Sequence, residues 1–366
     1  MRRGVVVIGA GPAGLAAAGA LEQEGVHALV LERSGALGSS WRTHYDRLHL
    51  HTARWLSGLP GLPVPRRFGK WVARDDWVAY LEDYARRFSL EIRCGVEVHR
   101  IEPDGEGWIL QADPEPVRAG AVVVATGYNN SPVLPDWPGQ EGFPGRLLHS
   151  KDYRNPSPFR GQDVLVVGSG NSGTEIAADL AEGGAGQVWL SVRSTPNLQR
   201  REILPGVPAQ LLGMLLPSLP APFVDALSLR LQAAIFGGFA AYGLPVPEEG
   251  VATRVANERI PLIDVGVLDQ IKAGRVEVVP GVERFEGPEV VLAGGSRLRP
   301  DAVVAALGFR RNLEPLVGAL GVLDERGRPA GSLPNLHFIG FRNSTRGLIF
   351  EISREARKTA RAIAAA

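Results

Sequence analysis

Two glycine-rich segments of this chain have the residue types and spacing that hold a pyrophosphate. Residues 9–14 read GAGPAG and follow the apolar run 5–8, and residues 168–173 read GSGNSG and follow the apolar run 164–167. A strand that leads through such a turn into a helix presents free backbone N–H groups and the positive helix end to phosphate oxygens. One such pattern is weak evidence in a chain with 45 glycines, but two in the same setting indicate two nucleotide sites.

The residues that end the next strand distinguish the two predicted nucleotides. In the first half, the predicted strand 27–31 ends at Glu32, about 20 residues beyond the glycines, where an acid commonly accepts hydrogen bonds from a ribose. In the second half, the predicted strand 187–192 ends at Arg193 and Ser194, and an arginine there suits a 2′-phosphate. We therefore expect FAD or NAD at the first site and NADPH at the second. Arg193 could instead be a solvated charge at a strand end.

Length and composition indicate a soluble two-domain enzyme. The chain has 366 residues, of which 45% are apolar and 22% charged, as in ordinary globular enzymes. Lys and Arg number 40 against 39 Asp and Glu, and the resulting net charge of +1 argues against a nucleic-acid partner. The first predicted strand begins by Val5, which leaves no room for a signal peptide, and no long uninterrupted apolar run predicts a membrane span. We expect a cytoplasmic protein.

The single cysteine, Cys94, excludes several kinds of chemistry. No disulfide can form within the chain, and no C-x-x-C motif can pass electrons through a dithiol, which excludes the thiol-dependent relatives of two-nucleotide flavoproteins. Cys94 lies in a strand-like stretch, and we expect it to be packed as a small hydrophobe. Nothing in the sequence predicts a metal site.

The other elements are expected to repeat the first unit. Asp75 and Asp76 are candidate caps of a helix that follows them, and residues 91–102 resemble a strand returning to the first sheet. The runs 121–125 and 301–306 resemble strands that end at tight turns. The predicted fold is α/β with two Rossmann-like dinucleotide-binding domains, the second inserted into the first. We place the first domain at 1–157 and 299–366 and the second at 158–298.

Residues 203–247 form an apolar insertion interrupted by prolines. We interpret it first as a lid or substrate wall, then as a contact between two copies of the chain in a homodimer. A membrane-surface patch is the third interpretation, which the polar residues Asp225, Arg230 and Gln232 disfavour.

A segment just before the second glycine motif carries a family resemblance. Phe143, Gly145, His149 and Tyr153 match F-x-G-x-x-x-H-x-x-x-Y, and the segment resembles the signature of flavin-containing monooxygenases, with Tyr153 where Baeyer–Villiger enzymes usually carry Trp. Further segments resemble the YUCCA subgroup, which oxidises indole-3-pyruvate to indole-3-acetate with FAD and NADPH. They are 45–51, 59–60, 80–82, 164–173, 193–194, 201–202, 242–244, 261–266, 278–281, 339–341 and 346–348.

The resemblance implies a reaction and a set of cofactor contacts. NADPH would reduce FAD, and the reduced flavin would react with O2 to give a C4a-peroxyflavin that oxygenates a small organic substrate. The first nucleotide would be contacted by Gly9, Gly11, Pro12, Ala13, Gly14, Glu32, Arg33, Trp41, Arg42, Val98, Ala125, Thr126, Gly127, Gly340 and Leu348. The second would be contacted by Gly168, Gly170, Asn171, Ser172, Gly173, Arg193 and Ser194.

Two histidines have different expected roles. His51 aligns with an asparagine that other flavin-containing monooxygenases place beside the flavin, and its imidazole could stabilise the peroxide as the one catalytic candidate; it could equally be bonded to backbone. His149 belongs to the signature, and the resemblance implies that it links the domains or couples their closure to the chemistry rather than transferring protons. A helix beginning near Phe350 would aim its N-terminus at the flavin.

Departures from the family pattern leave the substrate open. Residues 307–309 read LGF where typical members have TGY, and residues 197–200 read NLQR in place of an apolar run and a proline. An aromatic 2-oxo acid is the first expected substrate, followed by sulfides, amines and ketones. The alternatives are a flavin reductase or oxidase that passes electrons to a quinone, a carrier protein or oxygen, and a nucleotide sensor without turnover.

Overall fold

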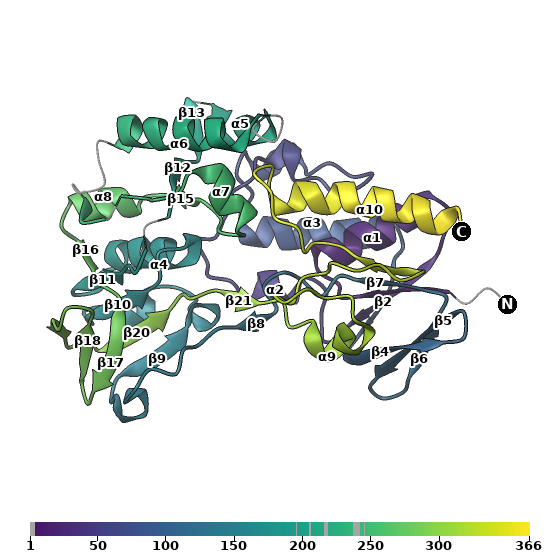
Figure 1. Ribbon diagram of the computed structural model, residues 1–366, viewed down its shortest axis with the longest axis horizontal. Helices are drawn as coiled ribbons and strands as arrows, with labels where there is room; N and C mark the ends of the chain where they lie inside the picture. The colour runs from purple at the N-terminus through teal and green to yellow at the C-terminus, as the bar shows by residue number, and fades with distance from the viewer. Residues whose placement is uncertain (1–3, 195, 205, 216–218, 237–241, 245) are drawn as a thin grey trace. The chain divides into compact units, whose positions relative to one another are not determined.

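The computed structural model describes residues 4–194, 196–204, 206–215, 219–236, 242–244 and 246–366 (Figure 1). Contacts between Cα atoms divide the chain into two compact units. Unit 1 comprises Met1–Thr43, Leu48–Ser131 and Phe309–Ala366, and unit 2 comprises His44–Arg47 and Pro132–Gly308. The second unit is therefore inserted into the first, together with a short segment from the first half of the chain.

Unit 1 is built on a five-stranded parallel sheet in the order β22-β7-β1-β2-β3. Its strands are β1 (Val5–Ile8), β2 (Ala28–Glu32), β3 (Glu91–Cys94), β7 (Ala121–Val124) and β22 (Leu336–Phe338). The inner strands β1 and β7 are buried throughout, which explains why they are unbroken apolar runs. The short helix α9 (Glu314–Val317) also belongs to this unit.

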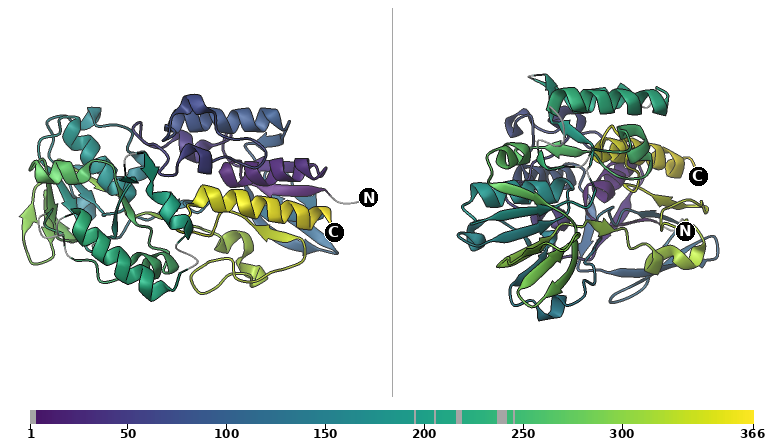
Figure 2. Two further views of the ribbon diagram at one scale, coloured as in Figure 1. Left: turned by 90° about the horizontal axis from the view of Figure 1, so that it is seen from above. Right: turned by 60° about the vertical axis from the view of Figure 1, so that its left-hand side comes forward.

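Three helices pack in the main core of unit 1. They are α1 (Pro12–Gln23), α3 (Arg74–Arg87) and α10 (Leu348–Ala364), and α10 runs alongside α1 (Figures 1 and 2). Fully buried Leu15, Trp77 and Tyr80 join Ile349 and Ala356 in one apolar cluster. The end of the chain thus helps to complete the core that its beginning starts.

Unit 2 repeats this architecture with a parallel sheet in the order β16-β11-β10-β20-β9. Its strands are β9 (Arg146–His149), β10 (Val164–Val167), β11 (Val188–Ser191), β16 (Val276–Val279) and β20 (Ala302–Ala305). Helix α4 (Asn171–Glu182) follows β10 as α1 follows β1, and α8 (Val267–Lys272) precedes β16. The prediction of two Rossmann-like α/β domains is confirmed.

Each unit also carries a three-stranded antiparallel sheet, which occurs at the corresponding point along the chain in both units. In unit 1, β4 (Val98–Asp104), β5 (Gly107–Ala112) and β6 (Val117–Ala119) come between β3 and β7. In unit 2, β17 (Val282–Glu286), β18 (Glu289–Leu292) and β19 (Arg297–Leu298) come between β16 and β20. The internal repeat extends well beyond the glycine motifs.

The unit boundaries differ from those expected at 157/158 and 298/299. Strand β9 lies before residue 157 but pairs with β20, and β20 lies after residue 298 but pairs with β10. Both belong to the second sheet because their backbone hydrogen bonds are made there. The short segment His44–Arg47 also groups with unit 2.

Three local expectations are wrong. Residues 91–102 are two strands, β3 and β4, which belong to different sheets and are separated at Gly95, where φ is +76°. Helix α3 begins at Arg74 with Ala73 as its N-cap, so Asp75 and Asp76 lie in the first turn, where acids favour the helix N-terminus. Cys94 is an exposed free thiol rather than a packed hydrophobe.

The apolar insertion 203–247 is described in part. It includes β13 (Glu202–Leu204), β14 (Val207–Pro208), α5 (Ala209–Leu215) and α6 (Ala221–Phe236), and residues 205, 216–218, 237–241 and 245 lie outside the described residues. Asp225 of α6 accepts hydrogen bonds from the first turn of α7 (Val251–Ala256), at 2.7 Å from Ala252 N. The pair β12 (Leu198–Arg200) and β15 (Leu262–Asp264) completes this region.

Two short strands, β8 (Ser131–Pro132) and β21 (Phe309–Arg310), stand where the chain leaves and re-enters unit 1. Over the described residues, no helix has the length and apolar character needed to cross a membrane.

Candidate cofactor sites

The first glycine turn, between β1 and α1, needs glycine for steric reasons at two positions. Gly9 has φ +103°, and a Cβ there would stand 2.6 Å from the carbonyl oxygen of Ala125. A Cβ at Gly14 would stand 1.7 Å from the carbonyl oxygen of Gly9. A Cβ at Gly11, the N-cap of α1, would meet no atom within 4 Å. Gly11 therefore borders open space, as a backbone that a pyrophosphate approaches must do.

Glu32 is held beside this turn by backbone donors. Its carboxylate accepts hydrogen bonds from Ala10 N at 2.7 Å and from Ser34 N at 2.9 Å, and its side chain is buried. Gly38 N donates to the Ala10 carbonyl oxygen at 2.9 Å, which fixes the start of α2 (Ser39–Arg42) at the same turn. The acid predicted to accept a ribose hydroxyl thus lies at the glycine turn.

The end of β7 joins the same cluster. Ala125 N donates to the Ile8 carbonyl oxygen at 2.9 Å, and Thr126 and Gly127 follow, with φ of +92° at Gly127. Thr126 Oγ1 is buried and has no hydrogen-bond partner among the described residues, and the same is true of Asn343 Nδ2. Buried polar atoms normally find partners, so these two atoms fit a bound polar group. The glycine cradle and the Thr126 hydroxyl together fit a bound dinucleotide.

Pro12 and Ala13 begin α1, and Ala13 contacts another predicted site residue. A Cβ at Gly340, where φ is +86°, would stand 3.0 Å from Ala13 Cβ. Gly340 N donates to Glu355 Oε2 at 3.0 Å, and burial raises the pKa of that carboxyl. The turn after β22 therefore lies against the first turn of α1.

Two of the residues predicted to contact the first cofactor have contacts elsewhere, and a third is exposed. Arg33 is the exposed residue, and Arg42 forms an ion pair with Glu82 of α3. Trp41 packs edge-on against Trp77, with ring centroids 5.9 Å apart. These contacts place α2 against α3 and leave a direct cofactor contact from Arg33, Trp41 or Arg42 as a prediction.

Val98, Leu348 and His51 lie in elements other than the glycine turn. Val98 pairs with Ala112 in the antiparallel sheet, and it is Val96 N that donates to the Glu32 carbonyl oxygen, at 2.9 Å. Leu348 is the first residue of α10, so that helix begins two residues before the expected Phe350. His51 is partly buried just before η1 (Arg54–Leu56), and its catalytic role stays a prediction.

The second glycine turn, between β10 and α4, repeats the geometry of the first. Gly168 has φ +118°, and a Cβ there would stand 2.4 Å from the carbonyl oxygen of Ala306. A Cβ at Gly173 would stand 1.9 Å from the Gly168 carbonyl oxygen, and one at Gly170, the N-cap of α4, would meet nothing within 4 Å. The backbone here suits a second pyrophosphate.

The strand register shows what replaces Glu32 in unit 2. Leu31 pairs with Ile8 at the end of β1, and Ser191 pairs with Val167 at the end of β10. The next residue is Glu32 in unit 1 and buried Val192 in unit 2, followed by exposed Arg193 and Ser194. Ser169 Oγ donates to the Ser194 carbonyl oxygen at 3.1 Å, which brings this strand end to the glycine turn.

Asn171 and Ser172 have side chains engaged within unit 2. Asn171 Oδ1 accepts from Ile263 N at 2.8 Å, which docks β15 on the start of α4, and Ser172 shares a side-chain hydrogen bond with Tyr45. Their backbone N–H groups remain at the helix N-terminus. A phosphate contact from these two residues would therefore come from the backbone.

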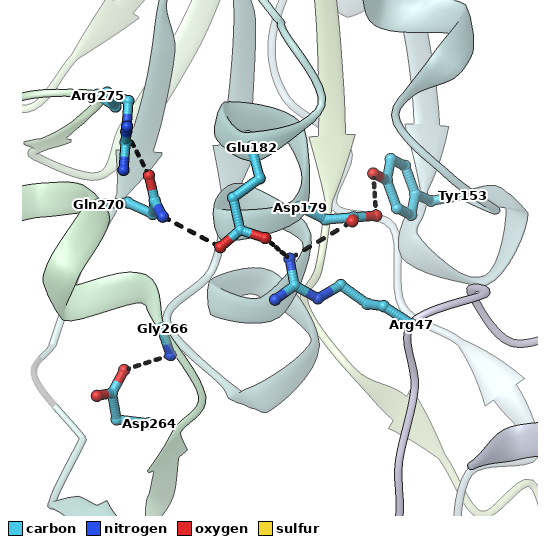
Figure 3. A network of polar contacts seen from close by, with 8 residues as sticks. All are labelled: Arg47, Tyr153, Asp179, Glu182, Asp264, Gly266, Gln270 and Arg275. Carbon is cyan, nitrogen blue, oxygen red and sulfur yellow. Dashed lines mark hydrogen bonds and ion pairs between the residues drawn. The ribbon is translucent and has the colours of Figure 1, made fainter.

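Tyr153, the last residue of the signature, is anchored on the nucleotide helix. Its hydroxyl donates to Asp179 Oδ2 at 2.7 Å, and Arg47 Nη1 lies 3.4 Å from Asp179 Oδ1 and 3.0 Å from Glu182 Oε2. Figure 3 shows Arg47 reaching the Asp179 and Glu182 carboxylates of α4, with Gln270 on the far side of Glu182. Burial raises the pKa of Asp179, although Tyr153 and Arg47 oppose this shift.

His149 is bonded at both ring nitrogens. Nδ1 accepts from Lys151 N at 3.1 Å, so Nε2 carries the proton and donates to the Gly308 carbonyl oxygen at 3.1 Å. Burial lowers the pKa of the imidazole, which keeps this neutral tautomer at neutral pH. His149 and Gly308 both belong to unit 2, so this bond lies within that unit, and the expected role of His149 in linking the domains stays a prediction.

The sequence analysis missed a buried cluster beside the second turn. Glu175 of α4 is 2% exposed, Tyr45 shares a hydrogen bond with it, and its charge acts on Arg201. Burial raises the pKa of Tyr45 and lowers that of Arg201. The signal in the sequence was Glu175 itself, an acid next to the apolar residues 176–178 of a predicted helix. An acid on the buried side of a helix is rarely without partners, so this position predicts a charged or polar neighbour.

Comparison with known proteins agrees with this geometry. Residues 6–204 match the family model described as pyridine nucleotide-disulphide oxidoreductase. The chain is 38% identical over 306 residues to indole-3-pyruvate monooxygenase YUCCA1 of Oryza sativa subsp. japonica, covering 82% of this chain and 75% of that protein. It is 36% identical over 341 residues to probable indole-3-pyruvate monooxygenase YUCCA9 of Arabidopsis thaliana, covering 91% and 81%. The chain belongs to the flavin-containing monooxygenase family.

A solved structure extends the likeness to the whole fold of this flavin monooxygenase. A doubly substituted mutant of a flavin monooxygenase from Stenotrophomonas maltophilia matches with a TM-score of 0.76 and 25% identity, over 100% of this chain and 99% of that one. The enzyme is a monooxygenase that uses a flavin and a nicotinamide cofactor and acts on a small organic substrate.

Proposed function

We propose that this enzyme binds FAD in unit 1 and NADPH in unit 2 and oxygenates an aromatic 2-oxo acid. The observation that carries the cofactor assignment is the different end of the second strand in two otherwise matching turns. An inward carboxylate, Glu32, suits a ribose hydroxyl, while buried Val192 followed by exposed Arg193 offers a 2′-phosphate a cation and no acid.

On this proposal, the residues of unit 1 bind and orient the flavin nucleotide. The N–H groups at the start of α1 would hold the pyrophosphate, Glu32 would accept from the ribose, and the Thr126 hydroxyl and Asn343 amide would gain the partners that they lack among the described residues. FAD supplies the oxygen chemistry when bound. His51 would donate a hydrogen bond at the reacting oxygen, as the sequence suggests.

The substrate assignment rests on the relatives, which are named indole-3-pyruvate monooxygenases. Indole-3-pyruvate, O2, NADPH and a proton would give indole-3-acetate, CO2, water and NADP⁺. One oxygen atom of O2 enters the new carboxylate and the other leaves as water, while NADPH supplies the electron pair. Bond breaking occurs between C1 and C2 of the 2-oxo acid.

Turnover under ¹⁸O2 tests this proposal. We expect indole-3-acetate that carries one ¹⁸O atom, formed in a one-to-one ratio with NADPH consumed, and His51→Ala should lower that ratio. Parallel reactions with a sulfide, an amine and a ketone test the other substrate classes. Product from one of these alone would overturn the substrate assignment, and NADPH oxidation that yields only hydrogen peroxide with every substrate would instead indicate an oxidase.

A further inference from the structure

A cavity of about 470 Å³ lies within unit 1, and none of its lining residues belongs to either glycine turn. One wall comes from residues 55–63, around η1, and the other from one face of α10. The lining is mainly apolar and includes Trp55, Leu56, Leu62 and Phe350. It also contains two cationic side chains, Arg354 and Arg357. Its volume is in the range of sites that enclose small organic ligands.

The charges that line this cavity are both positive. Phe350, Arg354 and Arg357 are spaced four and three residues apart, so they lie on the same face of α10. Glu351, the residue after Phe350, is fully buried and forms ion pairs with two arginines, Arg346 at 2.8 Å and Arg354 at 2.8 Å. One carboxylate between two guanidinium groups leaves a net charge of +1, and exposed Arg357 adds another.

The walls are held by hydrogen bonds to buried side chains. Ser353 Oγ donates to the Gly58 carbonyl oxygen at 2.8 Å and joins α10 to the facing segment. Fully buried Tyr80 donates to the Leu62 carbonyl oxygen at 2.6 Å and accepts from Leu59 N at 2.7 Å. The cavity is therefore preformed, which reduces the conformational cost of binding.

We propose that this cavity binds a small aromatic carboxylate. Trp55, which is 49% exposed, and Phe350 offer ring surfaces for an aromatic group. Arg357 offers charge-assisted hydrogen bonds to the ligand's carboxylate, and Arg354, whose Nε and Nη2 bind Glu351, adds positive charge to the same wall. The inference goes beyond the proposed function because it assigns a second ligand site, and it does so from the residues that line this cavity alone. It holds whatever substrate the flavin site oxygenates.

Calorimetric titration of the FAD-loaded enzyme with 1-naphthaleneacetate tests this site. We expect binding in the micromolar to millimolar range, and at least tenfold weaker binding of the neutral 1-naphthaleneacetamide. Arg357→Gln should weaken 1-naphthaleneacetate binding at least tenfold. Lys358→Gln removes an equal charge from the next residue of α10, outside the cavity lining, and should change the affinity less than twofold.

Several outcomes would overturn the proposal. They are no binding at millimolar concentration, equal affinity for the acid and its amide, or equal effects of Arg357→Gln and Lys358→Gln. Tighter binding of octanoate than of 1-naphthaleneacetate would refute the aromatic preference, and Arg357-dependent binding to phosphatidylglycerol vesicles without binding of the acid would identify a lipid surface instead. None of these readouts uses turnover, so a failed substrate assignment leaves this test intact.

Discussion

The two glycine turns have the same backbone and differ in the side chain that faces them. In each turn, the first glycine lies close to a carbonyl oxygen at the end of the neighbouring strand. A Cβ on Gly9 would stand 2.6 Å from that of Ala125, and a Cβ on Gly168 would stand 2.4 Å from that of Ala306. In unit 1 the Glu32 carboxylate accepts from Ala10 N, whereas in unit 2 the Ser169 hydroxyl donates to the Ser194 carbonyl. The shared backbone suits any pyrophosphate, and the strand end selects the nucleotide.

The largest expected effects come from filling the space at the third glycine. Gly14→Ala would place a methyl group 1.7 Å from a backbone oxygen, and we expect a loss of about 3 kcal/mol and purification without flavin. Gly173→Ala should leave flavin absorbance intact and abolish NADPH oxidation, because the clash lies in unit 2. Gly11→Ala is the control for folding alone, since a Cβ there meets no protein atom within 4 Å but would face the pyrophosphate. Flavin loss in both third-glycine variants would break the comparison.

Arg193→Ala tests the proposed nucleotide selectivity. Loss of a charge-assisted hydrogen bond should cost about 1–3 kcal/mol of NADPH binding free energy. That loss raises KM for NADPH roughly 5- to 150-fold and leaves KM for NADH unchanged. Steady-state kinetics with both coenzymes measures this difference. An equal rise with NADH would remove Arg193 from the 2′-phosphate and leave it as a strand-end charge.

Tyr153→Phe tests whether the signature tyrosine supports the second site alone. Removing its hydroxyl leaves the partly buried Asp179 carboxylate without one donor, which should cost about 1.5 kcal/mol and weaken NADPH binding more than flavin binding. Tyr84→Phe in unit 1 removes a bond to the Pro60 carbonyl oxygen and should affect flavin retention first. Thermal unfolding with each ligand present separates the two. The same ligand dependence in both variants would contradict the assignment.

Two carboxylates, fully buried Glu351 and partly buried Asp179, should give opposite dependences of stability on pH. Burial would raise the pKa of Glu351, but Ser344, Arg346 and Arg354 hold it below the usual value, so its contribution is present above the unfolded pKa and is lost as pH falls. Burial raises the pKa of Asp179, so its ionisation lowers stability as pH rises.

Melting temperatures from pH 4 to 8 check this contrast. Glu351→Gln should lower the melting temperature most at neutral pH, whereas Asp179→Asn should flatten the decline that begins as pH rises above the usual carboxyl pKa, once the lost Tyr153 bond is subtracted with Tyr153→Phe. Parallel pH curves for the two variants would show that these carboxylates do not differ as their contacts predict.

The repeated strand–turn–helix units were predictable because they depend on local sequence. Buried parallel strands are apolar throughout, and the positions of Gly9 and Gly168 follow from turn geometry. The domain boundaries were not, because the assignment of β9 and β20 to one sheet depends on pairing between strands far apart in the chain. The same reason hid the Tyr45–Glu175 contact, which joins residues 130 positions apart.

The interleaving of the two units also orders their completion during synthesis. Domains generally fold as units while the chain emerges from the ribosome, with the N-terminal one first. Here unit 1 gains β22 and α10 only from residues 309–366, whereas the last residue of unit 2 is Gly308. The unit that begins second is therefore complete first, and β7 of the nascent first unit has no β22 partner until the final segment arrives.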